Sequence, residues 1–283
     1  MPLFAVIILY EPSLDRLAQN IQAILPQVDH IVLVDNGSSN IGQTATAWGS
    51  LPQITLLQNE SNLGIAAATN IGLAFALHHQ ATWALTLDQD SVCPPNLINS
   101  YRPYLNRCDV GILCPVICDR NRAASCEASA PETELSFCIA SGALLRVDLW
   151  QRLGGQDEWM FIDLVDFEYC CRVRAAGYRI LRINTVYLTH EVGQIREVVF
   201  GSHRVAVYNH APLRRYYFAR NWVYFYRRHK GRISLWQAVK AELVQLIKIL
   251  LFERQKGAKL KAALRGICDG LSFHPPLWVP PGA

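Results

Sequence analysis

The stretch Leu85–Pro95, LTLDQDSVCPP, ends an apolar run on two carboxylates. Leu85 and Leu87 alternate with a threonine as in a β-strand, and Asp88 and Asp90 follow at its end. Two neighbouring carboxylates repel each other, so they either extend into solvent or are neutralised by a cation. Mg²⁺ or Mn²⁺ would neutralise both and keep coordination positions open for phosphate oxygens. Taken alone, the pair is more typical of a solvated turn or a helix cap, so its interpretation depends on the rest of the chain.

The residues before this stretch alternate between strand and helix patterns. Short β-branched runs predict strands, and apolar residues at helical spacing predict helices between them. The expected strands are Phe4–Leu9, Ile31–Val34, Ile54–Leu57 and Trp83–Leu87, and the expected helices are Leu14–Leu25 and Ile65–Leu77. This alternation predicts a parallel sheet covered by helices, with ligands at the carboxyl ends of the strands.

Polar residues follow three of the expected strands. Tyr10 comes after the first strand, Asp35 ends the second and Asp88 ends the fourth, so we expect a ligand at that edge. Asp35, in VDNGS, suits hydrogen bonding to a base or ribose and is equally typical of an Asx turn. The segment Asn62–Gly72, NLGIAAATNIG, allows close approach of a nucleotide or, alternatively, tight packing of a helix on the sheet.

The pattern after Pro95 stays mixed as far as residue 200 and then becomes helical, aromatic and basic. The expected elements are a helix near Leu97–Tyr104, strands Val110–Pro115, Phe137–Leu145 and Ile180–Leu188, and a helix over 167–176 that ends at Gly177. Residues 201–283 contain fifteen Lys and Arg against three Asp and Glu, whereas residues 1–200 contain twelve against twenty. The basic part therefore indicates an anionic partner.

The basic residues alternate with apolar runs, which favours an anionic membrane surface over nucleic acid. Leu235–Phe252 has one apolar face, typical either of a helix in the membrane interface or of a helix that covers the protein core. Its charged residues interrupt the apolar run, and a membrane-spanning helix needs about 18 or more uncharged apolar residues. The sequence therefore does not predict a membrane-spanning helix. The N-terminus lacks a signal-peptide pattern and the nine cysteines lack a zinc pattern, so we expect a cytoplasmic protein.

Five segments, taken in order, resemble a known family. They are VDNGS (34–38), NLGIAAATNIG (62–72), LDQDS (87–91), ASGALLR (140–146) and FIDLVDFEYCCRVRAAGYRI (161–180). Together they resemble the inverting glycosyltransferases of family 2, and among these the bacterial rhamnosyltransferases of cell-surface polysaccharides. The resemblance covers residues 3–230. It implies the α/β GT-A fold, with a mostly parallel central sheet flanked by helices.

The resemblance assigns roles to the residues of these segments. It implies that Asp88 and Asp90 hold Mg²⁺ or Mn²⁺ against the donor diphosphate, and that Asp35 contacts the base or ribose. The other residues that it places around the substrates are Tyr10, Asn62, Asn70, Gln89, Ser141 and Gly142. It also places His190 at the metal or diphosphate, although a lone histidine is more often structural. Gly142 would alternatively relieve crowding in a strand.

The resemblance further implies a catalytic base, Asp166. Val165 stands where the family motif has its first acid, so Asp163 or Glu168 would supply that negative charge. Three acids within six residues also raise at least one pKa by mutual repulsion. The alternative is a capping cluster, in which Asp163 or Asp166 lies at a helix N-terminus and pairs with Arg172 or Arg174.

The implied activity is transfer of L-rhamnose from dTDP-rhamnose, with inversion, to a hydroxyl of a lipid-linked intermediate of a cell-surface polysaccharide such as O-antigen. Residues 1–200 would form the catalytic domain, with 1–91 binding the nucleotide sugar and 92–200 the acceptor, and residues 201–283 a helical, basic region. The enzyme would sit peripherally on the cytoplasmic face of the inner membrane. The alternatives are a transferase that uses another UDP- or GDP-sugar, and a non-catalytic membrane-surface scaffold, which leaves the acids at the strand ends unexplained. A nucleotidyltransferase would need a Gly-rich phosphate loop after the first strand, which this sequence lacks.

Overall fold

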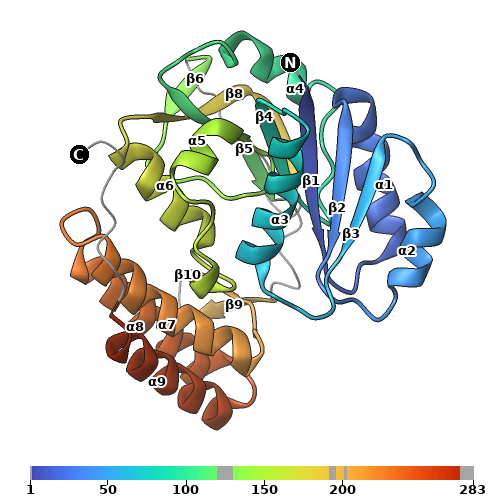
Figure 1. Ribbon diagram of the computed structural model, residues 1–283. Coiled ribbons are helices and arrows are strands. Elements are labelled where there is room, and N and C mark those ends of the chain that lie inside the picture. The colour runs from blue at the N-terminus through green and yellow to red at the C-terminus, as the bar shows by residue number, and fades with distance from the viewer. Residues whose placement is uncertain (1, 120–129, 191–195, 201–202, 275–283) are drawn as a thin grey trace. The chain divides into compact units, whose positions relative to one another are not determined.

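The computed structural model describes residues 2–119, 130–190, 196–200 and 203–274, which form two compact units (Figure 1). Within these residues, unit 1 comprises 2–119, 130–159 and 166–190, and unit 2 comprises 160–165, 196–200 and 203–274.

The described part of unit 1 contains an eight-stranded sheet in the order β3-β2-β1-β4-β7-β5-β8-β6. The strands are β1 (Leu3–Leu9), β2 (His30–Asp35), β3 (Ile54–Gln58), β4 (Trp83–Asp88), β5 (Val110–Asp119), β6 (Glu132–Glu134), β7 (Ala143–Arg146) and β8 (Arg179–His190). Strands β1 to β4 are parallel, and β5 is parallel to β8. Strand β7 is antiparallel to both β4 and β5, and β6 is antiparallel to β8. The expected mostly parallel sheet is confirmed for its N-terminal half.

Helices cover both faces of this sheet. They are α1 (Leu14–Ile24), α2 (Ile41–Trp48), α3 (Ile65–His78), α4 (Leu97–Tyr101), α5 (Val147–Arg152) and α6 (Val165–Ala175). Alternate β1 side chains such as Ala5 and Ile7 share a buried cluster with α1 and α4. On the opposite face, a Cβ on Gly72 of α3 would lie 2.3 Å from the Val6 side chain. The small residues of α3 therefore serve tight helix–sheet packing, one of the two alternatives for that segment.

The predicted elements are correct in type with two exceptions. The strand expected over Phe137–Leu145 forms only from Ala143, because Gly142 has φ +79° and Ala143 N–H donates to Ala140 O, which makes a turn. The helix expected near Leu97–Tyr104 ends at Tyr101 and continues as a 3₁₀ turn that contains Pro103. Helices α2 and α5, strand β6 and two later strands, β9 (Arg196–Phe200) and β10 (His203–Val207), were not predicted, and β10 lies in the part of the chain that was expected to be helical.

Unit 2 consists, in its described residues, of the antiparallel strands β9 (Arg196–Phe200) and β10 (His203–Val207) and the helices α7 (Pro212–Arg228), α8 (Leu235–Phe252) and α9 (Lys256–Ser272). Helix α9 packs closely along α7, since a Cβ on Gly266 would lie 2.3 Å from Tyr216 O. Helix α8 begins with a capping box between Ser234 and Gln237. None of the described helices is both long and apolar enough to cross a bilayer.

Candidate active site

Parallel strands bring the predicted polar residues to one edge of the sheet. In the register, Leu9 at the end of β1 pairs with Asp35 of β2, and Ile8 pairs with Asp88 of β4. Gln58, at the end of β3, pairs with Asp35 on its other side. The carboxyl ends of four neighbouring strands therefore lie together, as expected for a binding edge.

Asp35 is almost fully buried, at 1% exposure, and its two oxygens have different environments. Oδ2 accepts hydrogen bonds from Gly37 N–H at 3.1 Å and Ser38 N–H at 3.0 Å, which is the predicted Asx turn. Oδ1 is buried and has no hydrogen-bond partner within the described part of the chain. A buried carboxylate oxygen without a donor is costly. An N–H or O–H donor brought to this oxygen would therefore remove that cost.

A residue that the sequence analysis missed, Asn36, shapes the loop beside Asp35. It is 3% exposed, and its Nδ2 donates to Asn62 Oδ1 at 3.0 Å, while its Oδ1 accepts from Leu63 N–H at 3.0 Å. Asn62 Oδ1 also accepts from Gly64 N–H at 2.9 Å. Asn62 therefore helps to close the loop before α3. The sequence signal that could have pointed to Asn36 is an asparagine directly after the acid at the end of a strand.

Asp88 and Asp90 are half-buried at the turn after β4. Asn20 Nδ2 donates to Asp88 O at 2.7 Å, and Ser91 N–H donates to the same oxygen at 3.2 Å, which fixes the turn. Two hard carboxylates suit Mg²⁺ or Mn²⁺, whose remaining ligands are water and diphosphate oxygens. Within the described residues, no group of three or more His, Cys, Asp or Glu side chains is placed to hold a metal. His190 ends β8, and its side chain lies outside the described part of the structure.

Gln89, between the two acids, binds the chain after β1. Its Oε1 accepts from Tyr10 N–H at 2.9 Å, and its Nε2 donates to Tyr10 O at 3.2 Å. The Tyr10 side chain is 50% exposed. Gln89 therefore uses its amide to hold Tyr10, and the Tyr10 ring is the accessible group of the two.

Asp166 lies in the first turn of α6, half-buried, and accepts two backbone hydrogen bonds. Ala140 N–H donates to Oδ2 at 3.2 Å and Phe167 N–H donates to Oδ1 at 2.9 Å. The pKa of Asp166 is nevertheless raised to about 6. Burial is the largest cause, and the negative charge of Asp88 acts in the same direction. The two carboxylates from β4 and α6 are thus close enough to interact. A carboxyl group with a pKa near neutrality suits a general base.

The two acids that flank Asp166 in sequence have partners of their own. Glu168 is fully buried, and Arg172 Nη2 donates to it at 2.6 Å, so its carboxylate is not accessible to a substrate. Arg172 also donates to Leu153 O at 2.7 Å. Asp163, in unit 2, forms an ion pair with Arg214 at 2.9 Å. The alternative named Asp163 or Asp166 as the acid paired with Arg172 or Arg174, whereas Arg172 pairs with Glu168 and Asp163 pairs with Arg214.

Three more of the predicted residues make bonds within unit 1. Asn70 Nδ2 donates to Gln156 O at 3.0 Å and its Oδ1 accepts from Gln156 N–H at 2.7 Å, so Asn70 holds the segment after α5. Ser141 Oγ lies 2.6 Å from Ser91 Oγ, and both residues are buried. Gly142 N–H donates to Thr86 O at 2.9 Å. Ser141 and Gly142 therefore join the turn before β7 to the end of β4, directly beside Asp88.

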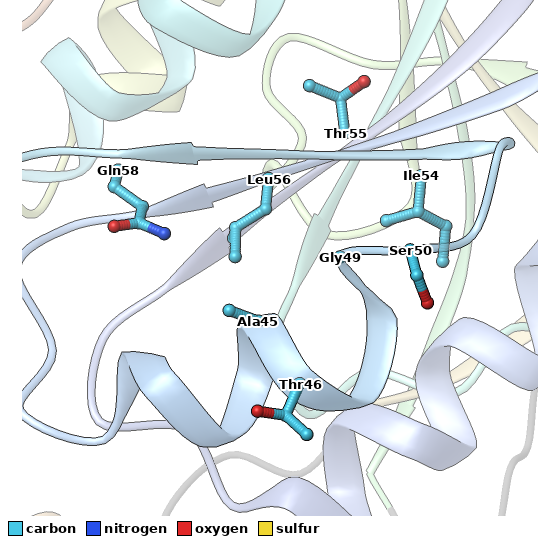
Figure 2. Close-up of a pocket in the computed structure, with 8 residues that line it drawn as sticks. All are labelled: Ala45, Thr46, Gly49, Ser50, Ile54, Thr55, Leu56 and Gln58. Carbon is cyan, nitrogen blue, oxygen red and sulfur yellow. The ribbon is translucent and has the colours of Figure 1, made fainter.

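A shallow depression of about 730 Å³ lies elsewhere on unit 1, between α2 and β3 (Figure 2). Its lining residues are Ala45, Thr46, Gly49, Ser50, Ile54, Thr55, Leu56 and Gln58. None of the acids described above lines it. It borders the binding edge at Gln58, the residue of β3 that pairs with Asp35.

Comparison with known proteins identifies the first part of the chain. Residues 5–124 match the model of glycosyl transferase family 2. This part of the chain is therefore similar to the family 2 glycosyltransferases. The matched residues include Asp35, Asp88 and Asp90, whereas Asp166 lies beyond them.

Relatives of the transferase agree with this assignment. A curated dTDP-rhamnosyl transferase, RfbF of Shigella flexneri, is 26% identical over 288 residues, which covers 95% of each chain. The solved structure of S. aureus TarS 1–349 has a TM-score of 0.60 at 13% identity and covers 96% of this chain and 72% of its own. GalNAc-T7, solved with UDP, GalNAc and Mn²⁺, has a TM-score of 0.60 at 13% identity and covers 98% of this chain and 58% of its own. These structures confirm the predicted GT-A fold.

Proposed function

We propose that this transferase moves L-rhamnose from dTDP-rhamnose, with inversion, to a hydroxyl of a lipid-linked intermediate of a cell-surface polysaccharide. The observation that carries the proposal is the interaction between Asp88, at the end of β4, and Asp166, whose pKa is raised to about 6. The choice of donor is supported by the relationship to the Shigella dTDP-rhamnosyl transferase along 95% of both chains.

The donor half of the proposed site consists of three acids. The unpartnered Oδ1 of Asp35 would accept a hydrogen bond from the nucleobase or ribose. Asp88 and Asp90 would hold a divalent cation, which would supply charge stabilisation to the leaving nucleoside diphosphate. The Mn²⁺ in the GalNAc-T7 structure supports this proposal, because that protein shares the fold.

Asp166 would act as the base in this proposal. At neutral pH a carboxyl group with a pKa of about 6 is mostly ionised, yet it is more basic than an ordinary aspartate. It would take the proton of the acceptor hydroxyl while that oxygen attacks the anomeric carbon from the face opposite the diphosphate. The C–O bond to the diphosphate breaks as the new glycosidic bond forms. A single displacement inverts the configuration without a covalent intermediate.

The proposed organisation of the chain follows the same scheme. Residues 1–91 would bind the nucleotide sugar, residues 92–200 the acceptor, and residues 201–283 would form the basic helical region. A lipid-linked acceptor places the enzyme in the cytoplasm, peripherally at the inner face of the membrane.

A donor panel tests the proposal. The purified protein is incubated with a lipid-linked acceptor and dTDP-rhamnose, a UDP-sugar or a GDP-sugar, each with Mg²⁺, Mn²⁺ or a chelator. We expect transfer from dTDP-rhamnose that stops with chelator. Transfer from UDP-N-acetylglucosamine instead would favour the alternative donor, which the TarS complex with UDP-GlcNAc brings into consideration.

A matched pair of variants tests the metal-binding role. We expect Asp88→Ala to weaken metal-dependent donor binding, whereas Asp148→Ala, which removes an exposed carboxylate on α5, should leave it unchanged. Donor binding is measured by calorimetry with and without the cation. Equal metal-dependent binding by Asp88→Ala and the parent would contradict the role of Asp88.

A further inference from the structure

Helix α8 of unit 2 presents a row of apolar side chains to solvent. Trp236 is 66% exposed, Leu243 47% and Ile247 53%. Further exposed apolar residues of α8 are Leu235, Val239, Val244, Leu250 and Leu251. Single exposed apolar side chains are common, but a continuous set along an 18-residue helix indicates a surface that contacts something else.

These residues share one face because of their helical spacing. Leu243 follows Trp236 by seven residues and Ile247 follows Leu243 by four, so the three side chains are in line. Lys240, which is exposed, belongs to the same line. We call the set Trp236, Val239, Lys240, Leu243, Ile247 and Leu250 the α8 face. Within unit 2, these apolar side chains therefore do not cover a core.

The opposite side of α8 packs within unit 2 and is mixed in character. Ala238 and Ile249 are buried there. Gln245 accepts a hydrogen bond from the buried Arg215 of α7, and burial of Glu242 raises its pKa to about 7. The row of apolar side chains lies on the other, exposed side of the helix, where a soluble protein usually has polar residues.

The charges around the α8 face are of one sign. Residues 212–272 contain fourteen Lys and Arg and three acids. Two of the acids have cationic partners within unit 2: Glu253 is buried and lies 2.8 Å from Lys259 Nζ, and Asp269 lies 3.7 Å from Arg265. The third, Glu242, faces inward. Arg214 is exposed and pairs with Asp163, and the other exposed cations are Lys230, Arg232, Lys240, Arg254, Lys256, Lys261 and Arg265.

We propose that the α8 face docks on an anionic lipid bilayer. Exposed Trp and Leu side chains would enter the boundary between head groups and acyl chains, while the surrounding Lys and Arg would pair with anionic head groups. The helix would lie in the interface, consistent with the lack of any described helix that is long and apolar enough to cross the bilayer. Such docking is independent of the sugar chemistry proposed for unit 1.

A second copy of the chain is the other candidate occupant of this face. In a two-fold contact the same patch meets itself, so Lys240 and its cationic neighbours would face their own copies. That repulsion opposes a dimer through this face, whereas an anionic bilayer attracts the same charges. The charge pattern therefore favours the bilayer.

Vesicle co-sedimentation of the full chain tests the proposal without any substrate. The vesicles contain phosphatidylcholine alone or equal parts of phosphatidylcholine and phosphatidylglycerol. We expect binding to the anionic vesicles that weakens with added salt, and much weaker binding to the neutral ones. Equal binding to both kinds of vesicle, or binding to neither, would overturn the proposal.

Variants identify the surface. Trp236→Glu together with Leu243→Glu should lower the partition constant on anionic vesicles by about tenfold or more, since each removes an apolar side chain and adds a negative charge. Lys240→Glu alone should lower it by roughly fivefold or more. Leu51→Glu is the matched control, because Leu51 is 39% exposed on unit 1, and it should bind like the parent. The circular dichroism of each variant is compared with the parent, because exposed positions should leave the fold intact.

Two results would contradict this assignment. One is unchanged vesicle binding by the double variant. The other is a parent protein that is dimeric by light scattering and becomes monomeric in the double variant, because the face would then be an interface between copies.

Discussion

Lowering the pH from 7 to 5 should slow transfer by about tenfold if Asp166 is the base. With a pKa of about 6, its carboxyl group is roughly nine-tenths ionised at pH 7 and one-tenth ionised at pH 5. An aspartate with the ordinary pKa of 3.8 would stay ionised over that range and give a flat profile. Burial is the largest cause of the raised pKa of Asp166. A cation bound beside Asp88 would leave this effect of burial in place.

The assay is kcat/KM for release of dTDP from dTDP-rhamnose between pH 5 and 8 at constant ionic strength. Thermal unfolding at each pH is the control. Since the pKa of Asp166 is raised in the folded state, the ionised group opposes folding, and this unfavourable contribution decreases as the pH falls from about 6 toward 3.8. Asp166 therefore cannot explain a loss of activity through acid unfolding. A flat kcat/KM profile between pH 5 and 7 in a folded protein would refute the assignment of the base.

Three further predictions concern the binding edge and the two units. Asp35→Asn should weaken dTDP binding by about tenfold in calorimetry, because an N–H₂ group would replace the free acceptor oxygen; unchanged affinity would exclude Oδ1 as a ligand contact. Glu168→Gln should lower the free energy of unfolding in urea by about 3 to 5 kcal/mol, because it leaves Arg172 buried without a counter-charge. Asp148→Asn, in the exposed pair with Arg152, should lower it by less than about 1 kcal/mol. Equal effects of the two variants would show that burial is not the cause. Asn221→Ala should lower the free energy of unfolding by about 2 kcal/mol or more. The reason is that Asn221 Nδ2 donates to the carbonyls of Met160, Ile162 and Asp163, at 2.7, 2.7 and 3.0 Å. An unchanged thermal midpoint would contradict this role.

The sequence predicts the N-terminal half of the sheet well because local and tertiary signals agree there. Strands β1, β2 and β4 are buried apolar runs that end at polar residues, and parallel pairing then brings Asp35 and Asp88 to the same edge. The sequence could not predict strand β7 correctly. Its start is determined by the turn at Gly142, where Thr86 and Tyr101 from distant parts of the chain hold the backbone.

Residue roles were harder to predict than residue positions. The sequence shows three acids, Asp163, Asp166 and Glu168, but not which of them pairs with Arg172. Only the folded chain brings the Leu153 carbonyl to Arg172 and buries Glu168 beside it. Likewise, Asn70 belongs to an alanine-rich helix that resembles a nucleotide-binding segment, yet its amide bonds Gln156, which lies 86 residues away in sequence. Long-range hydrogen bonds of this kind leave no periodic signal in the sequence.

The direction in which α8 faces could not be read from its periodicity either. An apolar stripe predicts a buried face in a soluble protein and an exposed face at a membrane with equal force. The hydrogen bond between Gln245 and the buried Arg215 of α7 shows only in the folded chain which side of α8 packs within unit 2.

The most direct test of the central claim compares Asp166→Asn with the parent protein. Transfer from dTDP-rhamnose to the lipid-linked acceptor and binding of dTDP with Mg²⁺ are measured on the same preparations. If Asp166 is the base, the variant binds dTDP with the affinity of the parent and its transfer rate falls by at least about 10²-fold. A variant that retains full transfer activity would contradict the account.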